Sequence, residues 1–423
     1  MVHQNFKLVD SMSVTENVIL GLTDQRFVLD LAAVKKDIKE LSARYNLRVD
    51  PDAYVWQLSV GEQQRVEILK LLYRKAEILI LDEPTAVLTP QESRELNHVV
   101  HLMRGEGKSA IFITHKMDEV MTFSDRVMVL RKGKVVAGKP TADTSPRDLA
   151  TMMVGREILY CIDKNPFAPG AAILQLDSVC AKDDRGLPAL KSVSLRVRSG
   201  EVLGIAGVAG NGQRELAEVI TGLRPVTSGT VMVKGKDATN KSPLSIIKSG
   251  VGHIPQDRSS VGAVGDMSVS DNLAMKGYRA RPLSLGIFLL PKKFLELAKK
   301  MIASFKIATP TPETHVKFLS GGNIQKTILA REIGACSSLL VAVYPSRGLD
   351  IGATESVRRQ LVAQRDAGLG VLFVSEDLDE LVQVCDTIAV LSEGTVMGIL
   401  PACEAEPERM GLMMAGVAQE ATV

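Results

Sequence analysis

The sequence predicts an α/β protein built from two related halves, each with a largely parallel sheet. Two observations carry this prediction: apolar runs alternate with helical patterns, and one arrangement of motifs occurs twice. The first copy reads LSVGEQQ (58–64), ILILDEP (78–84) and FITHK (112–116), and the second reads LSGGNIQ (319–325), LLVAVYP (339–345) and FVSED (373–377). Leu319 lies 261 positions after Leu58, and the other landmarks keep the same distance.

Several short apolar runs are predicted to be buried parallel strands, because their pattern is continuous rather than alternating. They are 78–82, 110–114, 127–130, 202–208, 339–343 and 371–375. Helical patterns alternate with them at 61–75, 90–104, 116–123, 212–222, 322–334, 352–367 and 377–384. This alternation is typical of an α/β fold with a parallel sheet.

The length of 423 residues suits two domains of about 150–250 residues each. We expect the first domain at 1–159, with a mainly helical insertion at 13–57. A linker is expected at 160–172, where KNPFAPGAA has two prolines, a glycine and no helical period. The second domain is predicted at 173–405, with a helical insertion at 267–318, followed by a C-terminal tail at 406–423.

Composition narrows the functional classes. The net charge is +2 and no stretch concentrates Lys and Arg, so no nucleic-acid partner is expected. Five cysteines are scattered without metal-ligand spacing, which favours a reduced cytosolic protein. The sequence has no signal-peptide pattern and no apolar run of about 18 residues that could span a membrane. A role at a membrane is therefore expected to depend on a partner.

The segment GVAGNGQR (207–214) follows an apolar run and opens a predicted helix. Its G-x-x-x-x-G spacing matches a phosphate loop, in which glycines let backbone N–H groups approach an anion. The positions concerned are Gly207, Gly210, Asn211, Gly212, Gln213 and Arg214. Gln213 stands at the lysine position and Arg214 at the serine or threonine position, so we expect nucleotide binding with poor catalysis. A tight turn without a ligand is the alternative interpretation.

The run ILILDEP is predicted to be a strand that ends in two carboxylates. We expect Asp82 to hold Mg²⁺ through water and Glu83 to polarise the attacking water. The second half has Val343 and Tyr344 at these positions, which keeps the strand and loses the metal site. A solvated turn would also explain one Asp-Glu pair, but the fixed distance from LSVGEQQ argues against it.

LSVGEQQ and LSGGNIQ are each predicted to start a helix. Hydroxyl and backbone donors at such a start form an anion site that the helix dipole supports. The residues concerned are Ser59, Gly61 and Glu62 in the first copy and Ser320, Gly322 and Asn323 in the second. An ordinary serine N-cap is the alternative for one motif alone, whereas the repeated spacing favours a functional role.

Other polar residues end strands at matching places in the two halves. His115 follows AIFIT where a γ-phosphate contact is needed, and its counterpart is Glu376, whose charge repels phosphate. Gln4 and Gln256 end MVHQ and HIPQ, and each precedes an M-S-V-[TS] motif. We expect both glutamines to act at Mg²⁺ and the attacking water. A surface or capping role is the alternative for His115, and an ordinary polar strand end is the alternative for each glutamine.

Together these motifs resemble the ATP-binding cassette family, and most closely the double-cassette ATPase subunits of bacterial nucleoside and simple-sugar importers. The resemblance covers nearly the whole chain. It rests on MVHQNFKLVDSMSVTENVILG, LDEPTAVLTPQE, GVAGNGQRE, LSGGNIQK and PSRGLDIGA. It implies two tandem phosphate-loop nucleotide-binding domains with helical subdomains, the second degenerate and the first truncated at its N-terminus.

The resemblance also implies two composite sites for ATP and Mg²⁺, each formed by both cassettes. The competent site would combine Gln4, Asp82, Glu83 and His115 with Ser320, Gly321, Gly322 and Asn323, where Asp82 and Gln4 serve the metal and Glu83 and His115 are catalytic. The weak site would combine residues 207–214 and Gln256 with Ser59, Gly61 and Glu62. Closure on ATP would drive transmembrane permease subunits, and an extracytoplasmic solute-binding protein would act indirectly. The expected location is peripheral, on the cytoplasmic face of the inner membrane.

One departure from the family pattern concerns the first cassette, which should open with a phosphate loop that carries Lys and Ser or Thr. The chain has no complete G-x-x-x-x-G-K-[ST] motif. We therefore expect Met1 to be an internal position of a longer polypeptide. A hydrolysis-deficient nucleotide-binding remnant is the main alternative to an active ATPase, and a double-cassette protein acting on DNA or ribosomes is a third hypothesis.

Overall fold

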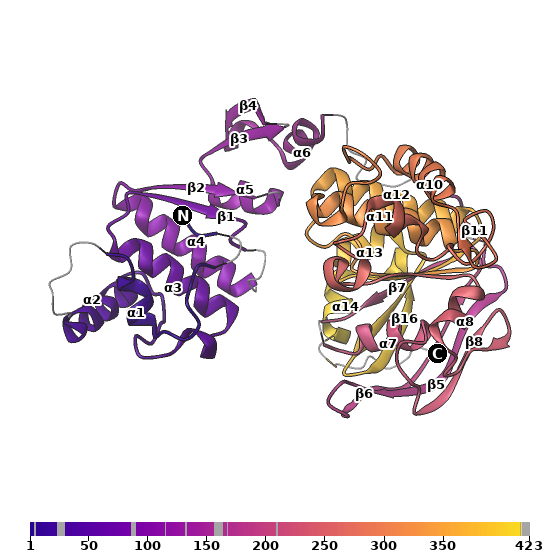
Figure 1. Cartoon of the computed structure of the whole chain (residues 1–423). Helices are drawn as coiled ribbons and strands as arrows, with labels where there is room; N and C mark the ends of the chain where they lie inside the picture. The colour runs from indigo at the N-terminus through magenta and orange to yellow at the C-terminus, as the bar shows by residue number, and fades with distance from the viewer. Residues whose placement is uncertain are drawn as a thin grey trace. The chain divides into compact units, whose positions relative to one another are not determined.

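The computed structural model describes residues 1–3, 6–22, 30–85, 90–114, 116–131, 133–155, 164–166, 168–208, 210–414 and 416. The chain divides into two compact units, Met1–Ile158 and Leu159–Val423 (Figure 1). The α/β fold class predicted from the sequence is confirmed. None of the helices in the described residues is long and apolar enough to span a bilayer.

The second unit is built on a six-stranded sheet in the order β10-β13-β14-β7-β15-β16. Its strands are β10 (Val251–Ile254), β13 (Leu339–Val343), β14 (Gly370–Val374), β7 (Val202–Ala206), β15 (Thr387–Ser392) and β16 (Thr395–Pro401). All neighbours pair in parallel except β15 and β16. Strands β7, β13 and β14 are buried along their whole length, as their continuous apolar sequences predict.

Each face of this sheet packs into its own apolar core. One face is covered by α11 (Gly321–Ala335), α12 (Ile351–Asp366), α13 (Leu378–Val384) and α14 (Pro407–Met414). The other packs against α7 (Gln213–Ile220), α8 (Pro243–Lys248) and a four-stranded antiparallel sheet of β5 (Ala172–Lys182), β6 (Pro188–Arg198), β8 (Ser228–Val233) and β9 (Lys236–Asp237). The expected C-terminal tail therefore includes a core helix, since Met410 and Met413 of α14 are buried.

The insertion expected at 267–318 contains helices and one short hairpin. Its elements are α9 (Val269–Ala274), β11 (Ser284–Leu285), β12 (Phe288–Leu289), α10 (Pro291–Phe305) and the 3₁₀ helix η4 (Val316–Phe318). A short π-helical segment, η3 (Arg258–Gly262), precedes it, and a 3₁₀ helix, η5 (Ala402–Glu404), precedes α14. Asn272 joins α9 to the preceding loop, because its side chain exchanges hydrogen bonds of 2.9 and 3.0 Å with the backbone of Val264.

The first unit repeats most of these elements. It contains α1 (Val14–Ile19), α2 (Leu31–Arg44), η1 (Val55–Gln57), α3 (Val60–Tyr73), β1 (Ile78–Asp82), α4 (Pro90–Gly105), β2 (Ser109–Ile113), α5 (Met117–Phe123), β3 (Arg126–Arg131), β4 (Lys134–Pro140), η2 (Thr141–Asp143) and α6 (Pro146–Val154). Strands β1 and β2 pair in parallel, and Val2 extends this pairing through a parallel bridge to Leu81. Its core includes Ile38, Leu69, Leu81 and Met103.

The sequence prediction for 127–130 is wrong in one respect. These residues form part of β3, but within the described residues β3 pairs only with β4, in antiparallel orientation. Met128 and Leu130 are 59% and 64% exposed, instead of buried. The physical reason is that the first unit has no described strand equivalent to β7, which pairs in parallel with β15 in the second unit.

Candidate functional site

The predicted carboxylates lie immediately at the end of β1, where the sheet fixes their backbone. The N–H of Asp82 donates to the carbonyl of Val2 over 3.1 Å, and the N–H of Glu83 donates to Ile113 over 2.8 Å. Glu83 has a φ of +45°, a left-handed conformation that is uncommon for residues other than glycine. Such backbone strain persists only where the surroundings enforce it, and it is frequent at active sites.

The second unit preserves this backbone without its carboxylates. Tyr344 has a φ of +47°, and its N–H donates to Val374 over 2.9 Å. Burial of the phenol raises the pKa of Tyr344 to about 12, so it is neutral at physiological pH. The preceding residue is Val343, buried in the sheet. The second copy therefore keeps the shape of the loop and lacks both groups that could hold a metal or activate water.

Gln4 and His115 lie outside the described residues, but the chain leading to each is placed. Val2 forms a parallel bridge with Leu81, and at the equivalent place in the second unit Ile254 pairs in parallel with Ala342. The segments that lead to Gln4 and Gln256 are therefore paired with the neighbouring strand in the same register. Gln256 itself follows β10 and is exposed. These pairings support the alignment of Gln4 with Gln256, although the roles of both glutamines stay predictions.

A buried carboxylate that the sequence analysis did not single out ties two strand ends together. Glu119, which is 8% exposed, accepts hydrogen bonds from Thr85 and, over 2.8 Å, from Thr114. Lys116 approaches the same carboxylate to 3.1 Å. Because Thr85 follows Glu83 and Thr114 precedes His115, Glu119 joins the two loops expected to carry the catalytic residues.

The equivalent carboxylate in the second unit is Glu380, which accepts 2.7 and 2.9 Å hydrogen bonds from Ser375 and Arg358. At the histidine position, Glu376 lies 4.0 Å from Arg347, and the guanidinium of Arg347 stacks 5.9 Å from the Tyr344 ring. An ion pair and a buried phenol thus stand where the first unit has a histidine and a glutamate.

LSVGEQQ and LSGGNIQ, here called the signature motifs, each start a helix, as predicted. Their serine side chains have different hydrogen-bond partners. In the first unit, Ser59 and Glu62 form a capping box, in which the Glu62 carboxylate accepts 2.8 Å hydrogen bonds from the Ser59 hydroxyl and N–H. These bonds, led by the hydroxyl, hold the pKa of Glu62 below its usual value. Ser320 instead accepts a 2.8 Å hydrogen bond from Asn323, a neutral group.

The remaining glycines of these motifs sit in the first turns of the two helices. Gly61 follows Ser59 on α3, while Gly321 and Gly322 open α11. A Cβ at Gly321 would lie 3.1 Å from the Arg258 guanidinium, whereas one at Gly322 would meet only Ala353 at 3.8 Å. The neighbouring Arg258 therefore restricts the position of Gly321 to a small residue, whereas Gly322 has room for a side chain.

The predicted phosphate loop forms a compact turn between β7 and α7. Gly210 and Gly212 have φ values of +91° and +101°, which glycine alone adopts without strain. The buried Gln213 side chain donates to the carbonyl of Val208 over 2.9 Å, so it folds back over its own loop. A Cβ at Gly207 would come within 2.3 Å of the Gln213 amide nitrogen. The C=O of Asn211 accepts a 3.1 Å bond from Gly394.

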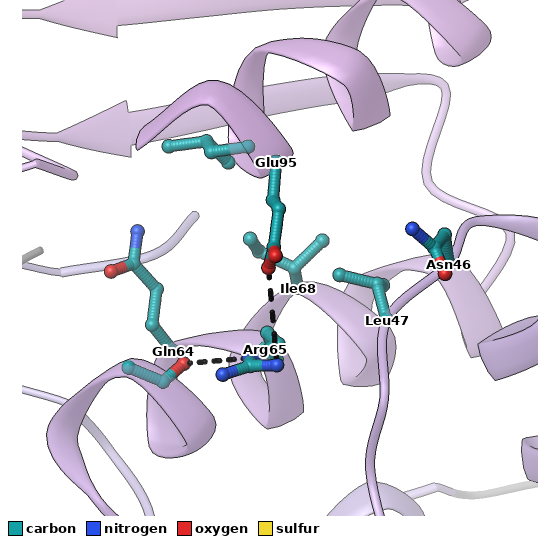
Figure 2. Close-up of a pocket in the computed structure, with 8 residues that line it drawn as sticks. Asn46, Leu47, Gln64, Arg65, Ile68 and Glu95 are labelled. Carbon is teal, nitrogen blue, oxygen red and sulfur yellow. Dashed lines mark hydrogen bonds and ion pairs between the residues drawn. The ribbon is translucent and has the colours of Figure 1, made fainter. Parts of the chain in front are cut away.

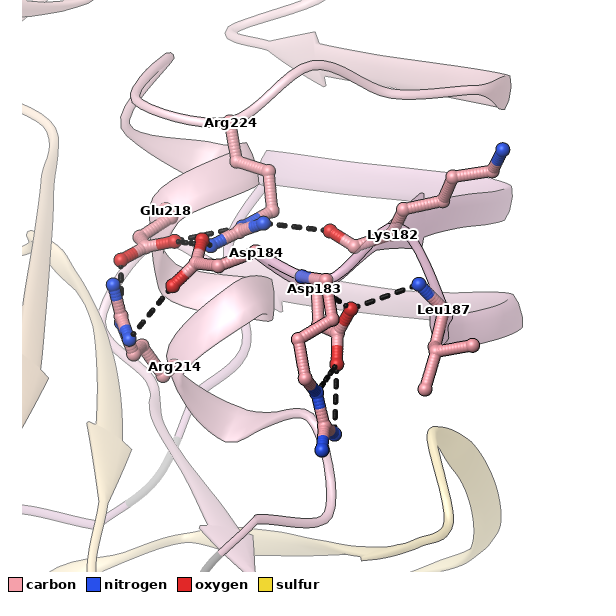
Figure 3. Close-up of polar contacts among 8 residues, drawn as sticks. Lys182, Asp183, Asp184, Leu187, Arg214, Glu218 and Arg224 are labelled. Atoms are coloured by element: carbon pink, nitrogen blue, oxygen red, sulfur yellow. Dashed lines mark hydrogen bonds and ion pairs between the residues drawn. The ribbon is translucent and has the colours of Figure 1, made fainter.

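Arg214 is held beside this loop by a charge cluster that sequence reasoning missed (Figure 3). It pairs with Glu218 at 2.7 Å and with Asp184 at 3.3 Å. Arg224 contacts the same two carboxylates at 2.7 and 2.6 Å. Gln213 and Arg214, which stand at the usual Lys and Ser/Thr positions, therefore both interact with other groups of the protein. The i,i+4 spacing of Arg214 and Glu218 is the one sequence signal for this cluster.

The tripeptide Gly107-Lys108-Ser109 also reads G-K-S, but it cannot act as a phosphate loop. It leads into β2 instead of following a strand and opening a helix. Its lysine ammonium donates 2.8 Å hydrogen bonds to Glu106 and to the Tyr45 hydroxyl. Within the residues that the structure describes, the first unit has no glycine loop that opens a helix after a strand.

A pocket in the first unit lies behind the signature helix, between α3, α4 and the chain after α2 (Figure 2). Its empty volume is about 320 Å³, open solvent included, and its lining includes Gly61, Gln64, Arg65 and Glu95. Gln64 donates to the carbonyl of Pro84 over 2.7 Å, which links α3 to the loop after Glu83. Gly61 is the one predicted site residue in this lining, so the pocket does not coincide with the predicted site.

The geometry of these sites defines a class of protein. Each unit combines a helix that starts at a serine cap with a parallel strand that leads into a strained loop, and the second adds a glycine loop at a helix start. These are features of α/β proteins that bind nucleoside triphosphates at helix N-termini.

Comparisons with known proteins support this class. The family model described as "ABC transporter" matches residues 1–86 and 190–342. A glucose import ATP-binding protein of Haloferax volcanii is 46% identical over 98% of this chain and 81% of its own length. A guanosine import ATP-binding protein of Bacillus subtilis is 45% identical over 99% and 82%, and a ribose import ATP-binding protein of Rubrobacter xylanophilus is 38% identical over 98% and 82%. The chain belongs to the ABC transporter family, whose ATP-binding subunits are ATPases.

Proposed function

We propose that this chain is the ATP-binding and ATP-hydrolysing subunit that energises an ABC importer of nucleosides or simple sugars. The identity of 38–46% to relatives named for glucose, guanosine and ribose import, over nearly the full chain, carries this proposal. Transmembrane permease subunits are its proposed partners, with an extracytoplasmic solute-binding protein acting through them. The proposed location is the cytoplasmic face of the inner membrane, where the chain would be peripheral.

In the proposed mechanism, water activation belongs to the first unit. Glu83, whose backbone is held in a left-handed conformation at the end of β1, is proposed to accept a proton from the attacking water. Glu119 holds the neighbouring loop that leads to His115, which is proposed to contact the γ-phosphate. Ser320, Gly321, Gly322 and Asn323 are proposed to serve the same triphosphate.

The residues present fit a Mg²⁺ ion. Asp82 supplies a carboxylate at a strand end, and Gln4 would add an amide oxygen; both are hard oxygen donors of the type this ion prefers. Mg²⁺ typically keeps waters and phosphate oxygens as its other ligands. When bound, the ion would neutralise developing phosphate charge.

In the second unit, the phosphate loop at 207–214 and Gln256 are proposed to bind nucleotide without efficient hydrolysis, together with Ser59, Gly61 and Glu62. The self-contact of Gln213 and the ion pairs of Arg214 support this assignment. A nucleotide that stays bound here without hydrolysis would have a structural role in the proposed cycle.

Uptake measurements test the proposal. Deletion of the coding region is expected to abolish ATP-dependent uptake of guanosine, ribose or glucose, and the wild-type gene is expected to restore it. Unchanged uptake of all three solutes would contradict the proposed function. The second candidate, a hydrolysis-deficient remnant, is favoured by the phosphate loop of the second unit, where Gln213 and Arg214 stand at the usual Lys and Ser/Thr positions and both contact other groups of the protein. It predicts nucleotide binding without phosphate release by the purified chain.

A further inference from the structure

The glycine loop of the second unit is followed by side chains that do not fit a magnesium ion. In phosphate-loop proteins, the Ser or Thr at the helix start and an Asp at the end of a neighbouring strand hold Mg²⁺. Arg214 stands at the first of these positions and Val343 at the second. A guanidinium repels a cation and has no lone pair to offer, and Val343 is buried in β13. The two positions that usually supply oxygen ligands therefore supply none.

The neighbouring side chains do not replace these ligands. Tyr344 is a neutral phenol, because burial raises its pKa to about 12. Glu376 lies 4.0 Å from the guanidinium of Arg347 and forms an ion pair with it. Gln256 is exposed and offers one neutral amide oxygen. Mg²⁺ in nucleotide sites is usually bound by one or two carboxylates together with phosphate oxygens and water, so this set of side chains does not fit the ion.

Arg214 instead places a positive charge at the start of α7, directly after the glycine loop. Its side chain is 57% exposed, so solvent and ligands can reach the guanidinium. A guanidinium presents its N–H donors in a planar fork that matches two oxygens of a phosphate group. Gly210 and Gly212 shape the loop before it, and the N-terminus of α7 adds its dipole. Arg214 can therefore neutralise phosphate charge where other phosphate-loop proteins use Mg²⁺.

The charge cluster in Figure 3 can release Arg214 without leaving a carboxylate unpaired. Arg214 contacts Glu218 at 2.7 Å and Asp184 at 3.3 Å. Arg224 contacts the same two carboxylates at 2.7 and 2.6 Å, and its own side chain is only 10% exposed. Exposed ion pairs contribute little to stability. Because both carboxylates keep Arg224 as a partner, a turn of the Arg214 side chain toward a bound phosphate costs little.

We propose that the second unit binds nucleotide without Mg²⁺, and that Arg214 exchanges its carboxylate partners for the phosphate groups of the nucleotide. The ligand class is a metal-free nucleoside diphosphate or triphosphate. Nucleotide binding by residues 207–214 is part of the proposed function, on which this step rests. The form of the ligand and the direct contact with Arg214 go beyond it.

The first unit differs at the corresponding strand end. Asp82, the last residue of β1, supplies the carboxylate that Val343 lacks in β13. An aspartate at this position is the usual protein ligand for the magnesium ion of a bound nucleotide. Removal of Mg²⁺ is therefore expected to spare nucleotide binding by the second unit and to impair the chemistry proposed for the first.

Nucleotide binding by the full chain, with and without Mg²⁺, tests the proposal. The probe is a fluorescent ATP analogue, titrated in buffer with excess Mg²⁺ or with excess EDTA. Hydrogen exchange of residues 210–217 in the same buffers shows whether the nucleotide is bound at the second-unit loop. We expect the affinity to be at least as high in EDTA as in Mg²⁺, because the free nucleotide keeps the full phosphate charge that Arg214 binds.

A pair of variants isolates the contribution of Arg214. Arg214→Ser removes the cation and restores the hydroxyl of the usual metal position. Its affinity in EDTA is expected to fall about tenfold or more, the typical effect of losing a hydrogen bond between charged groups, and to recover in part with Mg²⁺. Arg185→Ser is the matched control, because Arg185 is 80% exposed and pairs with Asp183 beside the cluster. The control is expected to bind like the wild-type chain in both buffers.

Asp184→Asn tests the exchange of partners in the opposite direction. The variant removes one carboxylate that competes with phosphate for Arg214, while Glu218 stays paired with Arg224. Its affinity in EDTA is expected to rise about twofold, in line with the small contribution of an exposed ion pair. Weaker binding by this variant would count against Arg214 as a phosphate ligand.

The outcomes separate the proposal from the function on which it rests. Nucleotide binding at 210–217 that is lost in EDTA would overturn the proposal and leave the proposed function intact. Unchanged affinity of Arg214→Ser in EDTA, or an equal loss in Arg185→Ser, would overturn it in the same way. No binding at this loop in either buffer would contradict both the proposal and the nucleotide binding assigned to the second unit.

Discussion

The ends of β1 and β13 have the same backbone conformation but side chains of different chemical character. Glu83 and Tyr344 share a left-handed φ, and each donates its N–H to the strand beside it. In one unit this strained position carries a carboxylate, and in the other a buried phenol with a raised pKa. The comparison teaches that the sheet and its neighbouring strand impose the loop conformation, whatever side chain stands there. The second copy thus keeps the loop conformation without the two carboxylates.

Replacement of Glu83 is expected to have the largest effect on activity. Glu83→Gln removes the proposed base and is expected to lower ATP hydrolysis by the importer at least about 100-fold. Tyr344→Phe changes the equivalent position of the second unit and is expected to leave hydrolysis within about twofold. Phosphate release by the purified importer measures both. Equal losses in the two variants would show that the units do not differ in catalysis.

The largest expected effect on stability concerns a buried ion cluster found in the second unit. Glu332 is fully buried and accepts hydrogen bonds from Lys276, from Arg331 over 2.8 Å and from the N–H of His253 over 2.9 Å. Burial lowers the pKa of His253 to about 4, so the imidazole is neutral at physiological pH. The first unit has Leu71 at the position of Glu332.

Glu332→Ala leaves two cations without their partner and is expected to lower the free energy of unfolding of the second unit by about 3–5 kcal/mol. Glu296→Ala, which removes an exposed carboxylate paired with Lys293, is the control and is expected to leave the free energy of unfolding nearly unchanged. Urea unfolding followed by hydrogen exchange of each unit measures the change. A cost no larger than that of the control would contradict a structural role for the cluster.

Acid is expected to destabilise the first unit through Glu106, which has Ala367 as its counterpart in the second. Hydrogen bonds from Lys108 and Tyr45 lower the pKa of Glu106 to about 2. Its contribution to stability is therefore present above the unfolded-state value near 4.5 and is lost as pH falls toward 2. Glu106→Gln is expected to destabilise the first unit at pH 7 and to have little effect at pH 2. Thermal unfolding at both pH values measures this; an equal effect at both would contradict it.

The sequence predicted most of the elements because their patterns are local. The continuous apolar runs at 78–82 and 339–343, for example, coincide with β1 and β13. The prediction that β3 is a buried parallel strand was wrong, because whether a strand is covered depends on a segment elsewhere in the fold. The ion pair of Arg214 with Asp184 was missed for the same reason, since 30 positions, including β6 and β7, separate the two residues in sequence.

The smallest expected effect distinguishes the two signature helices. Ser59 is bound by a carboxylate and Ser320 by an amide, although both serines cap helices of similar length. An anion that approaches Ser59 must displace Glu62 and meet its negative charge, which offsets the attraction of the helix N-terminus. Glu62→Asn copies the second unit and is expected to tighten nucleotide binding about two- to fivefold, corresponding to about 0.5–1 kcal/mol.

The reverse exchange, Asn323→Glu, is expected to weaken nucleotide binding by a similar factor. Titration of the purified chain with a fluorescent ATP analogue, with Mg²⁺ present, measures both affinities. Tightening in both variants would show that the charge at this position does not control binding. Because hydrogen bonds from Ser59 lower the pKa of Glu62, its carboxylate stays charged at neutral pH. The difference between the wild-type chain and Glu62→Asn is therefore expected to persist at neutral pH and to shrink only in acidic buffer.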